Sequence, residues 1–187
     1  ATTEKWGELR AQHIRNSLIR TRQKQPTAVS GLTIRKAVPA EYERIAHALN
    51  AFYAAYDLYT PHTAETLRGW LVETVFKRPF RHYYVAVDSE DNLLAGLAVA
   101  EQFRVVTMHV QNMPAPVRLL NRLVKMVPSD GILRQLSISK IWYAPEQLAA
   151  AQFLWESMRW QLRDVGSHLL HSYDSRSPVA KIISPPF

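Results

Sequence analysis

Three consecutive segments of the sequence decide the fold: LRQLSISKIWY (133–143), PEQLAAAQFLWESMRWQLRD (145–164) and SHLLHSY (167–173). In the first, Leu136, Ile138 and Ile141 are separated by small or polar residues, a pattern that predicts a strand. The second segment predicts a long helix that begins near Pro145 and is followed by Gly166, as is common at helix C-termini. The third segment predicts another strand. A strand, a helix and a strand in this order predict a crossover between parallel strands.

The segments around this unit continue the alternation of strands and helices. Alternating residues predict a strand over 32–38, and a polar turn at 88–92 between two apolar strands predicts an antiparallel hairpin. Helices are predicted over 39–56, 63–76, 114–127 and from residue 177 onward. We therefore expect an α+β fold of three layers: a mixed, mostly antiparallel sheet with one parallel strand-helix-strand crossover and helices on both faces.

The composition excludes several classes of protein. The chain has 187 residues, of which 47% are hydrophobic and 21% are charged, as expected for one globular domain or one domain with an arm. No apolar run approaches the roughly 20 residues of a spanning helix, so we expect no membrane span. The sequence has no cysteine, which excludes disulfides and thiolate chemistry. Seven histidines form no ligand motif, so we expect no metal, and the lack of a secretory signal favours a cytoplasmic protein.

Positive charge gathers near the N-terminus. The net charge is +7, and residues 10–24 hold five arginines and lysines with no acidic residue. Apolar residues near helical spacing predict a basic amphipathic helix over about residues 4–22. We therefore divide the chain into a basic helical arm at 1–30 and a domain at 31–187. Two roles stay open for the arm: docking on the domain through Trp6 and Leu9, or contact with a polyanion through residues 10–24.

At this point the chain resembles the GCN5-related N-acetyltransferase (GNAT) superfamily. The resemblance covers about residues 32–183, and it depends on the order of elements, on the opening LTIRKA (32–37) with its proline-led helix, and on the unit 133–173. It implies a GNAT-like fold and the transfer of an acetyl group from acetyl-CoA to an amine, on a small molecule or a peptide.

The resemblance also implies where coenzyme A binds. Members of the superfamily hold its pyrophosphate on a loop of the form Gln/Arg-x-x-Gly-x-Gly/Ala, with backbone N–H groups at a helix N-terminus. Here EQLAAA (146–151) takes that place: Ala151 fits, Ala149 replaces a glycine and Glu146 replaces the cation or amide. The strand end before it would offer backbone groups to pantetheine. The implied cofactor-binding residues are Ile141, Trp142, Tyr143, Gln147, Leu148, Ala149, Ala150 and Ala151.

Two residues are candidates for catalysis. Glu101, after the hairpin, could deprotonate an amine, and Tyr143, at the end of its strand, could act as an acid. The tyrosine that many members use as the acid falls in this register on Ser184. The family's last strands would follow Phe187, so we expect either that this chain is a fragment of something longer or that the strands are truncated or come from a partner. These departures support an alternative: a catalytically silent GNAT-like module that binds a protein or a nucleic acid. A second copy could supply the strands, so a homodimer is also possible.

Overall fold

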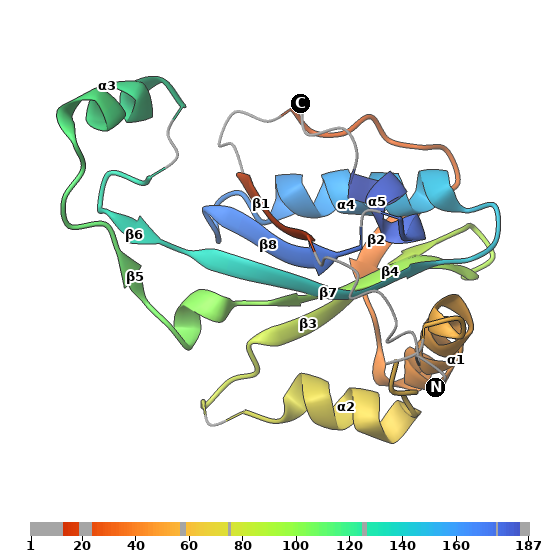
Figure 1. Ribbon diagram of the computed structural model, residues 1–187. Helices are drawn as coiled ribbons and strands as arrows, with labels where there is room; N and C mark the ends of the chain where they lie inside the picture. The colour runs from red at the N-terminus through yellow and green to blue at the C-terminus, as the bar shows by residue number, and fades with distance from the viewer. Residues whose placement is uncertain are drawn as a thin grey trace, which may run out of the picture.

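A six-stranded mixed sheet forms the centre of the molecule (Figure 1). The structure is a computed structural model that describes residues 13–18, 24–56, 59–74, 76–124, 127–174 and 176–183. The strand order is β1-β8-β7-β4-β3-β2, and all neighbours are antiparallel except β7 and β8. The strands are β1 (His13–Leu18), β2 (Thr33–Lys36), β3 (Arg81–Val87), β4 (Leu93–Ala100), β7 (Gln135–Tyr143) and β8 (His168–Tyr173).

Helices cover both faces of this sheet, because its central strands alternate apolar side chains between two cores. On β3, Val85 belongs to the core under α1 (Tyr42–Tyr53) and α2 (Ala64–Val72). Its neighbour Ala86 belongs to the core under α4 (Leu148–Gln161) and α5 (Pro178–Ile183). The mixed three-layer fold expected from the sequence is therefore confirmed.

The crossover from β7 through α4 to β8 has the predicted parallel geometry. Gln135 pairs with His168 and Ile138 with His171. α4 ends at Gln161, earlier than the sequence suggests, and Gly166 serves close packing instead of ending the helix. A Cβ at Gly166 would lie 2.5 Å from the Leu136 side chain, so only glycine lets the chain pass this close to β7.

The N-terminal segment differs from the prediction. Residues 13–18 form a strand, not part of a helix, and pair antiparallel with β8 from His13 and Tyr173 to Leu18 and His168. The outer edge of β8 offers a row of backbone donors and acceptors, which a strand satisfies and a helix does not. This strand therefore occupies the edge where the sequence appeared to lack one. Residues 1–12 and 19–23, with Trp6 and Leu9, lie outside the described residues.

A second arm, distinct from the N-terminal one, leaves the sheet between β4 and β7 and comprises residues 101–134. It contains the 3-10 turn η2 (Gln102–Arg104), a small sheet of β5 (Met108–His109) and β6 (Ile132–Leu133), and α3 (Ala115–Val124). A second 3-10 turn, η1 (Pro39–Glu41), leads from β2 into α1. Figure 1 shows α3 at the far end of the arm, away from the helices that cover the sheet. No helix in the part of the chain that the structure describes is long and apolar enough to cross a membrane.

The contact between Gly96 and Trp142 gives a test of this core. The two residues are paired across β4 and β7, and a Cβ at Gly96 would lie 2.6 Å from Trp142 Nε1 and 2.8 Å from Tyr83 Cε1. We expect Gly96→Ala to lower the free energy of unfolding by about 1–3 kcal/mol, because two buried rings must move. Gly69→Ala on α2 is the control: no atom lies within 4 Å of its Cβ, so alanine should stabilise the helix by about 0.5–1 kcal/mol. Urea unfolding measures both, and a Gly96→Ala variant as stable as wild type would contradict this packing.

Candidate functional site

The sheet opens between β7 and β8. Their pairing ends at Ile138 and His171, although β7 continues to Tyr143 and β8 to Tyr173. Beyond this point the facing backbone groups of the two strands have no partner in the ladder. The ladder between the two parallel strands therefore stops before their carboxyl ends.

A β-bulge in β7 coincides with the opening. The register of β4 and β7 shifts between Gly96 and Ala98, and Lys140 has a left-handed φ of 49°. Such an extra residue bends a strand and increases its twist. The bend therefore turns the last residues of β7 away from β8.

Two tyrosine hydroxyls hold the bulge from the α1 side. Tyr83 donates to the carbonyl of Lys140 and Tyr53 to the carbonyl of Ile141, each at 2.7 Å. Burial raises the pKa of Tyr53 and raises that of Tyr83 well above its ordinary value, so both hydroxyls stay protonated donors. The carbonyl of Ile141 therefore already accepts one hydrogen bond, from the α1 side of the sheet.

A half-buried pair of side chains lies beside the same bulge. Lys140 Nζ lies 2.7 Å from His62 Nε2 and 4.8 Å from the centre of the Trp70 ring. A lysine ammonium has only donors, so His62 accepts through a neutral ring. Burial and then the charge of Lys140 lower the pKa of His62, which agrees with this assignment.

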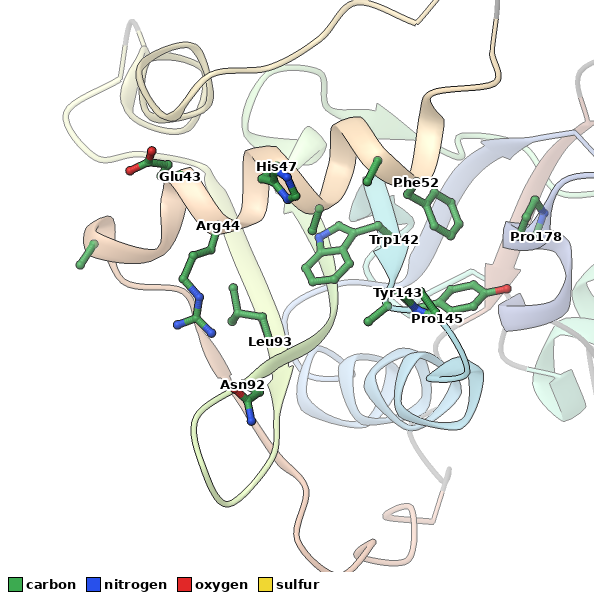
Figure 2. A pocket seen from close by; sticks show the side chains of 14 residues that line it. Glu43, Arg44, His47, Phe52, Asn92, Leu93, Trp142, Tyr143, Pro145 and Pro178 are labelled. Carbon is green, nitrogen blue, oxygen red and sulfur yellow. The ribbon is translucent and has the colours of Figure 1, made fainter.

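A cavity of about 1000 Å³ opens next to the end of β7 (Figure 2). One face of α1 forms one wall, and the start of β4 and the end of β7 form the other. Figure 2 shows the Trp142 ring between α1 and the start of β4, and Tyr143 directed toward Pro178 of α5. Cavities of this size hold ligands as large as a typical drug molecule. The lining residues are Ala40, Glu43, Arg44, His47, Ala48, Ala51, Phe52, Asn92, Leu93, Trp142, Tyr143, Ala144, Pro145 and Pro178.

The N-terminus of α4 follows the cavity directly in sequence. Glu146, exposed and with a left-handed φ of 63°, makes the turn into the helix. The N–H of Gln147 donates to the Ala144 carbonyl, and that of Ala151 donates to the Gln147 carbonyl. The N–H groups of residues 148–150 have no backbone acceptor among the described residues. The predicted set at 147–151 is therefore reduced to these three donors, which lie at the positive end of the helix dipole.

The structure separates the two catalytic candidates. Tyr143 pairs with Ala95 near the start of β4, whereas Glu101 follows Ala100 at its far end. Six residues of strand, about 20 Å, lie between these positions. The Glu101 carboxylate contacts Arg104 at 3.3 Å and His82 at 3.7 Å. Glu101 therefore fastens the turn η2 and lies outside the opening, because β4 runs antiparallel to β7.

Tyr143 lies at the opening itself. It is half-buried, and its ring meets the edge of Phe52 at 5.2 Å between centres. Its neighbour Ala144 donates to the Leu94 carbonyl of β4. Because backbone groups alternate along a strand, those of Tyr143 are directed to the other edge of β7, toward the opening. Both the side chain and the backbone of Tyr143 are therefore available at the site.

The α1 wall of the cavity was missed from the sequence. The core stripe of α1, with Ile45 and Leu49, was visible as an apolar pattern. The cavity face is a second stripe, made of small and polar residues at helical spacing. The spacing of these residues is a signal that sequence analysis could have used. The stripe consists of Ala40, Glu43, Arg44, His47, Ala48 and Ala51.

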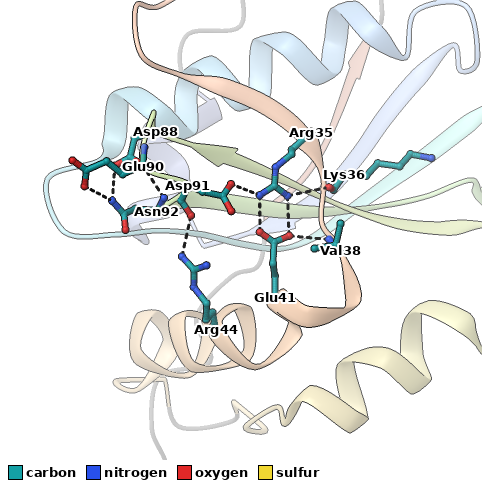
Figure 3. Close-up of polar contacts among 9 residues, drawn as sticks. All are labelled: Arg35, Lys36, Val38, Glu41, Arg44, Asp88, Glu90, Asp91 and Asn92. Carbon is teal, nitrogen blue, oxygen red and sulfur yellow. Dashed lines mark hydrogen bonds and ion pairs between the residues drawn. The ribbon is translucent and has the colours of Figure 1, made fainter.

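A polar cluster fixes α1 against the sheet (Figure 3). The Arg35 guanidinium donates to both Glu41 carboxylate oxygens, at 2.7 and 2.8 Å, and also to Asp91 in the β3–β4 turn. The N–H of Val38 donates to Glu41 as well, and Arg44 on α1 donates to the Asp91 carbonyl. Since Arg44 also lines the cavity, the cluster sets the position of that wall.

The described residues contain no metal cluster. None of them form a group of three or more His, Cys, Asp or Glu side chains that could hold an ion. The groups that the site offers for binding and chemistry are backbone N–H groups, the Tyr143 hydroxyl and the polar residues of the α1 wall.

Comparisons with known proteins support the fold. No protein-family model and no curated protein sequence matches the chain. Among solved structures, Saccharomyces cerevisiae N-myristoyltransferase with bound myristoyl-CoA is 9% identical, with a TM-score of 0.55 over 80% of this chain and 33% of that one. A second structure of that enzyme, with myristoyl-CoA and inhibitors, is 7% identical, with a TM-score of 0.60 over 86% of this chain and 42% of that one.

More distant is a GCN5-related N-acetyltransferase from Kribbella flavida, 16% identical, with a TM-score of 0.45 over 73% of this chain and 68% of that one. The chain thus spans between a third and about two fifths of the N-myristoyltransferases that it matches. At these identities the likeness concerns the fold alone, and the chain shares that fold with the N-myristoyltransferase structures.

Glu41 provides a test of the polar cluster. Its hydrogen bonds from Arg35 lower its pKa below the ordinary value of 4.5, so they stabilise the fold above about pH 4.5, and this stability is lost as the pH falls through the lowered pKa. We expect Glu41→Gln to lower the free energy of unfolding by about 2 kcal/mol at neutral pH and to reduce its acid dependence. Glu43→Gln, exposed on the same helix, is the control. The free energy of unfolding is measured with urea between pH 3 and 7. If Glu41→Gln showed the same dependence on pH as wild type, as Glu43→Gln should, this role of Glu41 would be contradicted.

Proposed function

We propose that this chain is an acyl-CoA-dependent N-acyltransferase that moves an acetyl group from acetyl-CoA to an amine. One observation carries the proposal: the opening between β7 and β8 is followed, four residues after β7, by a helix N-terminus with three free N–H groups. A ligand with an extended amide-containing arm and a pyrophosphate fits this order of groups, because a strand edge binds amides and a helix N-terminus binds anions.

Tyr143 is the strand residue that would bind the extended, amide-containing part of the ligand. Its N–H and C=O are directed to the opening and could pair with the amides of pantetheine, as one more strand would. The residues predicted on either side contribute less, since Ile141 gives its carbonyl to Tyr53 and Trp142 pairs with Gly96. Beyond Tyr143, the N–H groups of residues 148–150 would hold the pyrophosphate.

The acceptor amine, on a small molecule or a peptide, would enter through the cavity beside α1. A neutral amine attacks the thioester carbon, the new C–N bond forms, and the C–S bond breaks to release the thiolate of coenzyme A. The proton that the amine loses ends on that thiolate. The Tyr143 hydroxyl is the group at the opening that could deliver it. Catalysis would otherwise consist of holding the two reactants in line.

The alternative, a silent module that binds a protein or a nucleic acid, also has specific support. Ala149 brings a methyl group where the family's glycine allows close approach, and the carboxylate of Glu146 would repel a pyrophosphate. Glu146 is exposed, so its carboxylate can point to solvent and away from a bound pyrophosphate. This removes one objection to the enzyme and so favours it over the module. Contact of residues 10–24 with a polyanion, a homodimer and a cytoplasmic location stay predictions.

Binding of acetyl-CoA separates the two functions. We expect Ala149→Pro to weaken it by at least about 1 kcal/mol, because it removes one N–H donor at an exposed first-turn position that tolerates proline. Glu146→Gln should strengthen it by removing a like charge. Glu65→Pro, at the same position of α2, is the matched control and should bind as wild type does. Calorimetry on the four proteins decides: no binding by wild type and by Glu146→Gln alike would leave the silent module.

Turnover tests the assignment of the acid. We expect Tyr143→Phe to lower kcat by a factor of about 100 while the Kd for acetyl-CoA stays within twofold, because the backbone of residue 143 is retained. Glu101→Gln should leave kcat unchanged, since that carboxylate lies at the other end of β4. Release of free thiol from acetyl-CoA, measured with a panel of amines, gives the rate. An unchanged kcat in Tyr143→Phe, or a large loss in Glu101→Gln, would reverse the two roles.

A further inference from the structure

The apolar side of helix α3 is exposed to solvent, whereas its polar side faces the body of the protein. Its polar residues Arg118, Asn121 and Arg122 line a cavity that the body of the protein closes on the other side. Asn121 also exchanges two hydrogen bonds with the backbone of Val127. Its apolar side chains point to solvent instead, with Leu119 64%, Leu120 53% and Leu123 81% exposed. A surface helix of a globular protein ordinarily has the opposite arrangement.

Exposed apolar side chains are concentrated on this arm. Eleven large hydrophobic residues of the described chain are exposed, and seven of them lie between residues 105 and 123. These seven are Val105, Val106, Met108, Val117, Leu119, Leu120 and Leu123. Single exposed apolar residues are normal, but Leu119, Leu120 and Leu123 lie together on one side of a short helix, and such a patch marks a contact surface.

The same arm is strongly basic. Residues 102–129 contain Arg104, Arg118, Arg122 and Lys125 and no acidic residue. The cavity behind α3, about 760 Å³, is lined by four arginines, of which Arg134 pairs with Asp130 and Arg163 with Asp164. The other two, Arg118 and Arg122, have no ion pair among the described residues. The occupant of this surface must therefore combine an apolar phase with negative charge.

These two requirements select among the possible partners. A second copy of α3 would satisfy the apolar face, but it would bring together two copies of a segment that carries only positive charge over residues 102–129, which costs energy. The body of this protein meets the polar face of α3, not the apolar one. An anionic bilayer meets both needs: a helix of ten residues, about 15 Å long, can lie flat with its leucines among the acyl chains and its arginines among the headgroups.

We propose that α3 docks this protein on the surface of an anionic lipid bilayer. Leu119, Leu120 and Leu123 enter the boundary of the acyl chains. The long side chains of Arg118 and Arg122, both exposed, lie above them at the level of the lipid phosphates. The arginine-lined cavity behind α3 then lies at the level of the headgroups and accepts further phosphates. The proposal is independent of coenzyme A, since α3 lies on the arm and not at the opening of the sheet.

Vesicle flotation tests this docking with the whole protein and without acetyl-CoA. We expect wild type to float with vesicles of phosphatidylcholine and phosphatidylglycerol, and far less with phosphatidylcholine alone. The double variant Leu120→Glu with Leu123→Glu should bind the anionic vesicles at least tenfold more weakly. Val72→Glu, at a valine of α2 that is 54% exposed, is the matched control and should float as wild type does.

The charge contribution has its own variant. Arg118→Gln with Arg122→Gln should weaken binding to anionic vesicles by about fivefold for each cation removed, and should reduce the effect of added salt. Flotation of both double variants at wild-type levels would overturn the proposal. So would a wild-type protein that does not float but sediments as a dimer that the two glutamates dissociate, because a second copy would then cover α3. Unchanged thermal unfolding of the variants confirms that they are folded.

Discussion

The extra residue at Lys140 in β7 is the constraint on which the site depends. Without it, β7 and β8 could stay paired to their ends, and the sheet would have no opening between these two strands. A bulge leaves backbone groups without ladder partners, and this chain satisfies two of its carbonyls with the hydroxyls of Tyr53 and Tyr83. The opening is thus stabilised from the face of the sheet that α1 covers, by two tyrosines that take no part in any proposed chemistry.

This arrangement gives α1 two tasks. Tyr53, near its C-terminal end, holds the bulge, while the small residues of another face of the helix line the cavity. The bonds from Arg35 to Glu41 and Asp91 fix the N-terminal end of the same helix to β2 and to the β3–β4 turn. Any movement of α1 would therefore change the cavity and the support of the bulge together.

The sequence predicted what depends on local pattern and missed what depends on distant partners. Alternation in 133–143 and 167–173 was enough for the parallel crossover, and the turn at 88–92 was enough for the hairpin. The strand β1 could not be seen, because six residues with mixed spacing take their conformation from the edge of β8. Glu101 was misplaced because only the antiparallel register with β7 shows which end of β4 lies at the opening. The left-handed Lys140 carries no local signal either, since lysine is not typical of that conformation.

The pairing of β1 with β8 has a consequence for how the molecule is made. His13 pairs with Tyr173, so 160 residues separate the partners of this ladder. A ribosome releases the first of these strands long before it makes the second, and the closure of so large a loop is entropically costly. This edge of the sheet can therefore be completed only after β8 has been made, and native contacts this distant in sequence slow folding. Until then β8 carries an open edge, and the nascent chain is most vulnerable to aggregation in that interval.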